Sequence, residues 1–429
     1  MANHHPESSN IKPHAMSGLL RSSILALDFF LIITALYQLK PASRSLLIEG
    51  LGAQALPYVW LGSAAALLVT VAIYRGVLER HGRVRVVLAS CLLFIAALIG
   101  FRLLAAQPTA TMAVAFYIFV DIFGVVLVEQ FWSLANGSYR TDEGRRWYGF
   151  VGTGGLLGGV AGGGLAALLI KHTPLQTPDL MLVAALFVGL ILALTWAIDR
   201  KGLLRREDEP ASTTTPADIG GWRLIASKRY LVLIAAALLL AQAISPLIEY
   251  QFLRIIETTY PEREARTAAL SLFFSILSGI SIGVNLILTP LVLSGLGVLT
   301  GLLIQPLAMA AATAGFMLHP TLIPAAIMKI SDRGLSYSIN RAAKEILYIP
   351  IEPILMAQAK AWIDMFGYRL FKAMGSLVII GVTALAANGF GVVDLGWVVL
   401  GGCAIWAWVL ILLHREYLRM TATQRAPSD

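Results

Sequence analysis

The stretch DRGLSYSINRAAKEILYIPI (332–351) carries five ionisable residues within its first fourteen positions, although apolar sequence lies on both sides of it. These residues are Asp332, Arg333, Arg341, Lys344 and Glu345. A charged side chain at the centre of a bilayer costs about 2.5–3.5 kcal/mol on insertion scales. We therefore expect this segment to face an internal cavity rather than lipid, and we expect the cavity to handle a charged solute.

The composition of the whole chain indicates a membrane protein. Of its 429 residues, 57% are hydrophobic and only 14% are charged, whereas about 25% of the residues of soluble domains are charged. The apolar runs are continuous and near 20 residues long, which is enough for a helix to cross about 30 Å of hydrocarbon. The expected fold class is an all-α membrane protein with about 12 transmembrane helices in two six-helix bundles.

The apolar runs divide into two sets of six. In the first half we expect spans at 22–42, 53–75, 85–105, 109–136, 147–171 and 179–199. In the second half we expect spans at 229–256, 266–292, 296–318, 320–349, 360–387 and 391–414. The predicted domains are an N-terminal bundle at 1–200, a cytoplasmic linker at 201–222 and a C-terminal bundle at 223–429. The linker is charged at its start and then rich in Ser, Thr and Pro, with nothing to bury.

The basic residues predict the orientation of the chain. Lys and Arg gather in alternate connections and in the tail, at 75–85, 140–146, 200–229 and 415–425. Such residues collect on the cytoplasmic side of membrane proteins. We therefore expect both termini and the linker to be cytoplasmic, in a bacterial inner membrane. The net charge of +8 then has an explanation other than nucleic-acid binding.

Two further motifs bear on the fold. The segment GVLERHGRVR (76–85) resembles the loop between the second and third spans of the major facilitator superfamily, which fits the six-plus-six arrangement. The segment GTGGLLGGVAGGG (152–164) has glycines at a spacing of four, which lets a second helix approach closely. It lacks the Gly-Lys-Ser/Thr of a phosphate loop, so we interpret it as a packing face.

Polar side chains within the membrane concentrate in the first, fourth, seventh and tenth spans, where three-helix repeats would line a central site. The predicted substrate-binding residues are Lys40, Arg44, Asp121, Glu249, Arg341 and Lys344. The predicted supporting or gating residues are Tyr37, Glu129, Gln242, Asp332, Arg333, Asn340 and Glu345. A continuous α-helix would place Asp332, Asn340 and Lys344 on one face. At any single position, an ion pair that stabilises the bundle or a side chain that reaches the interface is an open alternative.

The several cations among these residues favour an anionic substrate, because Arg and Lys both bind carboxylate or phosphate. The carboxylates could bind protons or balance the cations. The sequence has no nucleophile motif and no zinc-ligand spacing, so we expect no enzymatic activity, no cofactor and no metal. Cys91 and Cys403 fall inside predicted spans, where they fit packing roles. The expected partners are a small anionic substrate and the lipid bilayer, with no nucleic acid, and the expected state is a monomer.

Three segments resemble the nucleotide translocase (ATP/ADP carrier) family of plastids and intracellular bacteria. Lys344–Glu345 with Tyr348–Ile349–Pro350 is similar to its Lys-Glu-x-x-Tyr-x-Pro signature. The other two are FWSLANGSYRTDEGRRWYGFVGTGG (131–155) and FFLIITALYQLKPASRSLL (29–47). The resemblance implies nucleotide exchange by a secondary transporter. By motif position it also implies roles for Lys40 or Arg44, Asp121, Glu249 and Lys344.

The chain departs from the family pattern in its first span. KPASRS (40–45) stands where the family tends to have Arg-Asp-x-Lys-Asp, and Asp121 stands for the more usual Glu. Two alternatives to a nucleotide carrier therefore stay open. One is a transporter of the same fold for another anion, such as a polycarboxylate metallophore or a lipid-linked phosphate. The other is a membrane sensor or assembly factor without transport activity.

Overall fold

The structure is a computed structural model that describes residues 12–139, 141–200, 225–226, 228–348, 350–363, 367–384 and 391–425. Every regular element within these ranges is helical. Ten of the described helical segments are long and apolar enough to cross a membrane. The expected linker at 201–222 lies outside the described residues.

The first half of the chain forms six long helices. They are α1 (Lys12–Leu51), α2 (Leu56–Arg80), α3 (Arg83–Leu104), α4 (Ala110–Ser138), α5 (Thr141–His172) and α6 (Leu180–Arg200), with short 3₁₀ turns at Ala53–Ala55 and Thr177–Asp179. Helix α1 contacts α4, α5 and α6. Leu39 of α1, Phe116 and Phe131 of α4 and Ala184 of α6 are fully or almost fully buried in this core. The core fixes the orientation of α1, which carries three of the predicted site residues, Tyr37, Lys40 and Arg44.

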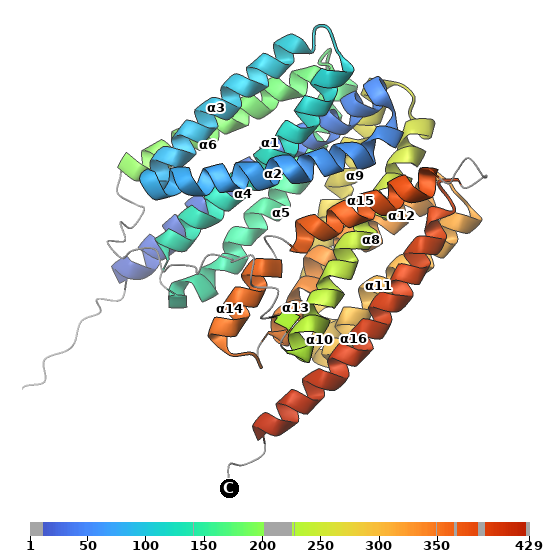
Figure 1. Ribbon diagram of the computed structural model, residues 1–429. Helices are drawn as coiled ribbons and strands as arrows, with labels where there is room; N and C mark the ends of the chain where they lie inside the picture. Colours follow the sequence, from blue (N-terminus) through green and yellow to red (C-terminus); the bar gives the residue numbers. More distant parts are fainter. Residues whose placement is uncertain are drawn as a thin grey trace, which may run out of the picture.

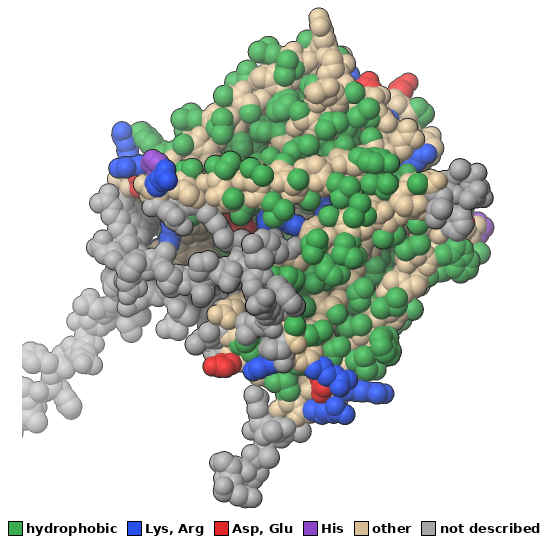
Figure 2. Space-filling model, in the orientation of Figure 1, with side chains coloured by type: hydrophobic (Ala, Val, Ile, Leu, Met, Phe, Trp, Pro, Cys, Tyr) green, Lys and Arg blue, Asp and Glu red, His purple; other side chains and the backbone are tan. Residues whose placement is uncertain are grey.

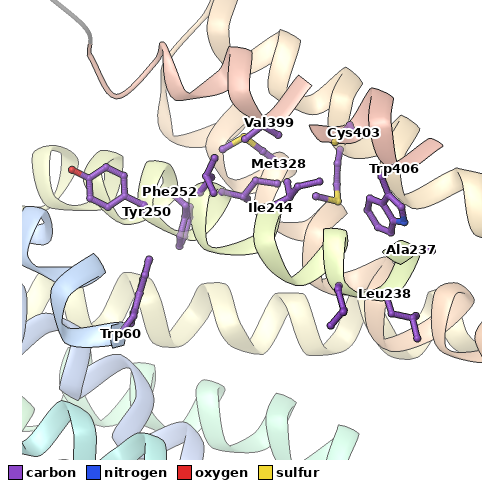
Figure 3. Close-up of a cluster of buried hydrophobic side chains, with 14 of the residues drawn as sticks. Trp60, Ala237, Leu238, Ile244, Tyr250, Phe252, Met328, Val399, Cys403 and Trp406 are labelled. Carbon is purple, nitrogen blue, oxygen red and sulfur yellow. The ribbon is translucent and has the colours of Figure 1, made fainter. Parts of the chain in front are cut away.

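The second half is more interrupted. Its helices are α8 (Arg229–Thr259), α9 (Arg263–Gly283), α10 (Thr289–Gly295), α11 (Gly297–Leu318), α12 (Leu322–Leu335), α13 (Arg341–Leu347), α14 (Pro353–Trp362), α15 (Tyr368–Ala384) and α16 (Leu395–Arg425). Figure 3 shows part of its core, where Ile244 of α8 lies near Met328 of α12 and Cys403 and Trp406 of α16. Cys403 is buried there as a free thiol, in agreement with its predicted packing role.

The span expected at 320–349 is broken rather than continuous. A π-helical turn, η4 (Ser336–Asn340), separates α12 from α13. A π turn holds more residues than an α turn, so it rotates the following helix relative to the preceding one. The span is therefore not the continuous α-helix on which the single face expected for Asp332, Asn340 and Lys344 rests. Neither this region nor α15 is among the ten segments that are apolar enough on their own.

The glycine-rich face of α5 packs against two helices at once. A Cβ atom on Gly158 would lie 2.5 Å from the carbonyl oxygen of Phe30 in α1. A Cβ atom on Gly163 would lie 2.7 Å from the carbonyl oxygen of Ser271 in α9. Because no side chain fits at either position, the packing interpretation of this motif is confirmed.

The helices form two groups in space, α1–α6 and α8–α16, coloured blue to light green and yellow-green to red (Figure 1). Contacts between the groups run mainly through α5 with α9, α1 with α9, and α2 with α15. Apolar side chains cover much of the visible surface (Figure 2). Leu92, Leu186 and Leu291 are among the exposed apolar residues of the protein, as expected for helices that face lipid.

Candidate solute-binding cavity

A cavity of about 300 Å³ lies between the two groups of helices. Its walls come from α1, α2 and α4 on one side and from α8, α9, α12 and α15 on the other. Figure 2 shows Lys or Arg side chains and an acidic side chain in a hollow between apolar surfaces. The charged residues that line the cavity are Lys40, Arg44, Asp121, Glu249, Lys329, Arg333 and Lys372.

Glu249 joins cations from both halves of the chain. Its Oε1 lies 2.8 Å from Nη2 of Arg44, on α1. Its Oε2 lies 2.9 Å from Nζ of Lys329, on α12. The side chains of Arg44 and Lys329 are only 7% and 2% exposed. Each buried charge therefore has an opposite charge at contact distance, which the low dielectric of the interior requires.

The ion pairs continue into α12. Nζ of Lys329 also lies 2.9 Å from Oδ2 of Asp332, and Nε of Arg333 lies 3.4 Å from the same oxygen. Ser245 Oγ donates to this oxygen at 2.7 Å. Successive ion pairs thus link four residues across the interface between the halves, in the order Arg44, Glu249, Lys329 and Asp332.

Aromatic rings form another part of the wall. Nζ of Lys40 lies 5.0 Å from the ring centroid of Phe274, and the guanidinium carbon of Arg44 lies 5.5 Å from that of Tyr117. Cations are attracted to aromatic faces at these distances. Trp60 Nε1 donates to the Tyr117 hydroxyl at 2.8 Å, which fixes that ring.

The cavity carries a surplus of positive charge. Its lining has five basic side chains and two acidic ones. Asp332, behind the wall, adds a third acid through its contact with Lys329. Two positive charges are therefore left over among the described residues, and a bound anion would balance them.

The structure brings five of the predicted site residues together in this lining: Lys40, Arg44, Asp121, Glu249 and Arg333. Two more contact lining residues, because Asp332 pairs with Lys329 and the Tyr37 ring lies 5.6 Å from Nζ of Lys40. Asn340 donates to Gln305 at 2.5 Å, behind α12.

The other predicted residues lie elsewhere or cannot be placed. Lys344 Nζ donates to the Tyr368 hydroxyl at 2.7 Å, and Glu345 pairs with Lys360 at 2.8 Å. Neither Lys344 nor Glu345 lines the cavity, and the same holds for Glu129 and Gln242. The side chain of Arg341 lies outside the described residues.

Sequence reasoning missed Lys329 and Lys372. Lys329 ends a long apolar run, but it precedes Asp332 by three positions, which places the two on one face of a helix. That spacing was the available signal. Lys372 stands in RLFKAM (369–374), close to Arg369, and nothing in that segment distinguishes it from an interfacial lysine.

One end of the cavity is closed by contacts between the halves, which we call the α1–α9 cluster. It comprises Ser45, Glu49, Ala53, Glu257, Arg263 and Arg266. Arg263 pairs with Glu49 at 3.1 Å, and Arg266 donates to the carbonyl oxygen of Ser45 at 3.1 Å. Ala53 N donates to Glu257 at 3.0 Å.

Nearby, Thr177 donates from its backbone and its hydroxyl to Glu264, at 2.8 and 2.7 Å. Deeper in the molecule, two further hydrogen bonds join the halves. The Ser275 hydroxyl donates to the carbonyl oxygen of Val160, and the Ser278 hydroxyl donates to the Tyr37 hydroxyl.

Comparison with known proteins identifies the family. Residues 19–342 match the model of the Major Facilitator Superfamily, and residues 318–417 match that of the TLC ATP/ADP transporter. ADP,ATP carrier protein 3 of Rickettsia bellii is 22% identical over 357 residues, which are 71% of this chain and 70% of the relative. ADP,ATP carrier protein 1 of Rickettsia conorii is 24% identical over 300 residues, which are 62% of this chain and 60% of the relative.

Solved structures agree on the fold. The nucleoside transporter NupG superposes with a TM-score of 0.66 at 15% identity, over 92% of this chain and 99% of that chain. The POT family transporter PepTSo gives 0.65 at 10% identity, over 93% and 98%. The predicted all-α fold and the resemblance to nucleotide carriers are both confirmed, and a non-transport sensor or assembly factor is set aside. The chain belongs to the Major Facilitator Superfamily, as a multi-pass membrane transporter distantly related to the ADP,ATP carriers and not as an enzyme.

Proposed function

We propose that the protein is a secondary active transporter of a small anionic solute, most simply a nucleotide or a related phosphorylated compound. The observation that carries this proposal is the cavity between the halves, whose described lining, together with Asp332 behind it, holds two more positive than negative charges. Arg and Lys are suited to phosphate, Arg as a fork and Lys as a point charge. The distant relationship to ADP,ATP carriers supports the nucleotide assignment.

In this proposal the anion competes with Glu249. In the structure the Glu249 carboxylate forms ion pairs with both Arg44 and Lys329. A phosphate that enters the cavity offers the same two cations a second anionic partner, while Lys40, Arg333 and Lys372 attract it from the other walls. Binding of the anion would therefore loosen the contact between α1 and α8.

Transport would follow by alternating access, with exchange or proton coupling. The loop charges favour cytoplasmic termini, so in this proposal the α1–α9 cluster would lie on the outer side. The cavity would then be reached from the cytoplasm in this conformation. Rocking of one bundle against the other would break the cluster and open the outer side.

The domain arrangement belongs to the same proposal. The bundles would comprise 1–200 and 223–429, joined by the cytoplasmic linker at 201–222. The protein would act as a monomer in a bacterial inner membrane.

A second substrate class is favoured by the size of the cavity. A volume of about 300 Å³ lies at the lower end of the range of small-molecule sites, about 300–1,000 Å³. A compact anion other than a nucleotide, such as a carboxylate, therefore stays a candidate. A lipid-linked phosphate would need an apolar route from the bilayer into the cavity.

The test is a thermal-shift screen of the purified protein with nucleotides, citrate and isoprenoid phosphates. We expect stabilisation by at least one anion in the wild type and in Lys171→Ala, which changes an exposed residue at the end of α5. We expect the stabilisation to be lost in Lys40→Ala. An anion response that is unchanged in Lys40→Ala, or no response to any anion, would contradict the proposal.

A further inference from the structure

Three side chains in the cavity wall differ from the rest in their hydrogen bonding. Arg44 and Lys329 are both engaged by Glu249. In contrast, the structure gives the Lys40 ammonium two aromatic neighbours, at 5.0 and 5.6 Å, and no hydrogen bond or ion pair within the described part of the chain. Among the described residues it gives no hydrogen bond or ion pair to the side chains of Lys372 and Asp121, although both line the cavity. Donors and an acceptor are therefore both available to a solute.

Asp121 is the most unusual of the three. It lies near the middle of α4, and its Oδ2 is buried without a hydrogen-bond partner. A buried acceptor that is left unsatisfied destabilises a protein, and more so when it is charged. The neighbouring cations do not supply the missing hydrogen bond to Asp121, because Arg44 and Lys329 donate to Glu249. The carboxyl group of Asp121 is thus placed in the wall with its hydrogen-bonding capacity unused.

The three groups come from different elements around one volume. Lys40 lies on α1 and Asp121 on α4, both in the first half, while Lys372 lies on α15 in the second half. Between them the wall is apolar or aromatic, with Trp60, Phe274 and Leu277. A solute that satisfied all three groups would be an anion on one side and a hydrogen-bond donor on another, and it would touch both halves.

We propose that the solute carries a hydrogen-bond donor, a hydroxyl or an amine, in addition to its anionic group, and that Asp121 accepts a hydrogen bond from it. This proposal rests on the proposed function, because it assumes that the cavity binds an anion. It adds a chemical requirement that positive charge alone does not impose. Simple polyanions without a donor would bind weakly, since they leave the Asp121 oxygens unsatisfied and repel its charge.

The test compares pairs of anions that differ only in the donor. Suitable probes are adenosine monophosphate with its 2′,3′-dideoxy analogue, which lacks the hydroxyls, adenosine monophosphate with purine riboside monophosphate, which lacks the amine, and 2-hydroxyglutarate with glutarate, which carry the same charge. Dissociation constants would be measured by calorimetry on the full chain in detergent. In the wild type we expect the donor-bearing member of at least one pair to bind about tenfold tighter or more, which is the usual scale for a hydrogen bond to a charged group.

Two variants of Asp121 test whether this residue causes the tighter binding of the donor-bearing probe, and a variant of Asp28 is the matched control. We expect Asp121→Asn, which keeps a neutral acceptor, to reduce the advantage of the donor-bearing probe. We expect Asp121→Leu to abolish it. Asp28→Asn should leave it unchanged, because Asp28 is also a buried carboxyl with an unpartnered Oδ1 in the first half but does not line the cavity.

Several outcomes would overturn the proposal. Equal binding of both members of each pair to the wild type would do so, and so would an advantage that survives in Asp121→Leu. A change of pH dependence in Asp121→Leu that is the same for both members would make Asp121 a proton-binding group instead. If none of these probes binds to the wild type while the thermal-shift screen shows stabilisation by another anion, this proposal fails and the proposed anion transport stands. No response in either assay would overturn both.

Discussion

At the scale of single residues, Glu249 links the two halves of the chain through its ion pairs. It is the one described acid that contacts a cation from each half of the chain, Arg44 and Lys329. Breaking a buried ion pair by removing one partner costs about 3–5 kcal/mol, because the remaining charge is left uncompensated. In this protein two cations would be left, and an anion from solution can replace the lost carboxylate.

We therefore expect Glu249→Gln to lower the melting temperature of the empty protein and to enlarge the stabilisation by a bound anion. The measurement is a melting curve with and without the anion. Glu416→Gln is the matched control, since Glu416 pairs with the exposed Arg229 and Arg419 near the end of α16 and such surface pairs contribute at most about 1 kcal/mol. A smaller anion response in Glu249→Gln than in the wild type would show that Glu249 contacts the solute directly.

At Lys344, the family motif and the structure make different predictions about solute binding. The motif implies a role in nucleotide binding, whereas the structure places its ammonium on the Tyr368 hydroxyl, away from the cavity lining. We expect Lys344→Ala to change the dissociation constant for an anion less than threefold, and Lys372→Ala to raise it about tenfold or more, the effect of one lost charged contact. Calorimetric titration of both variants decides between them, and the reverse order would favour the motif.

At the scale of helices, the glycines of α5 determine how closely it packs against its neighbours. Its glycines let the backbones of α1 and α9 approach, so one helix holds both halves in place. Overpacking of a close contact typically costs about 1–3 kcal/mol. In contrast, Gly152 on the same helix has open space where a Cβ would be added.

We expect Gly163→Ala to lower the melting temperature and to slow transport, because a methyl group there meets the backbone of Ser271 and Ser275. Gly152→Ala should be neutral or slightly stabilising, since Ala favours a helix over Gly by roughly 0.5–1 kcal/mol. Differential scanning fluorimetry and vesicle flux would test the pair. An equal effect of both substitutions would mean that close packing on α9 does not matter.

Apolar runs locate the helices of the first half, and the cost of a charge in lipid locates much of the cavity. That cost singles out Lys40, Arg44, Asp121 and Glu249, and the structure brings all four into one cavity lining. It does not reveal which way each side chain points. The π turn at Ser336–Asn340 contacts α9 and α11, and a single-sequence periodicity cannot represent such contacts, so the sequence predicts Lys344 on the face of Asp332. Lys329 was missed because its partner, Glu249, is far away in sequence.

At the scale of the whole molecule, several hydrogen bonds and ion pairs between the halves gather near the end of α1. The α1–α9 cluster joins the end of α1 to the start of α9 and the end of α8, and Figure 1 shows these ends meeting. A transporter that alternates its access has to separate these contacts in each cycle. Locking them should arrest the cycle without removing the binding site.

The lock is a disulfide between Glu49→Cys and Arg263→Cys, which replaces the pair at 3.1 Å. Oxidation is expected to abolish vesicle flux while anion binding measured by calorimetry persists, and a reductant should restore flux. The native cysteines are free and buried. The single variant Glu49→Cys, treated identically, is the control. Full flux in the oxidised double variant, with the disulfide verified by mass spectrometry, would show that the cluster does not open during transport.

The charges of α12 also bear on how the chain is made. Lys329, Asp332 and Arg333 stand within five positions, and their helix is not among the segments long and apolar enough to cross a membrane. Glu249, which pairs with Lys329, belongs to α8 and is synthesised earlier. The carboxylate is therefore already part of the nascent chain when α12 is made. The order of the helices along the chain supplies this counter-charge before Lys329 appears.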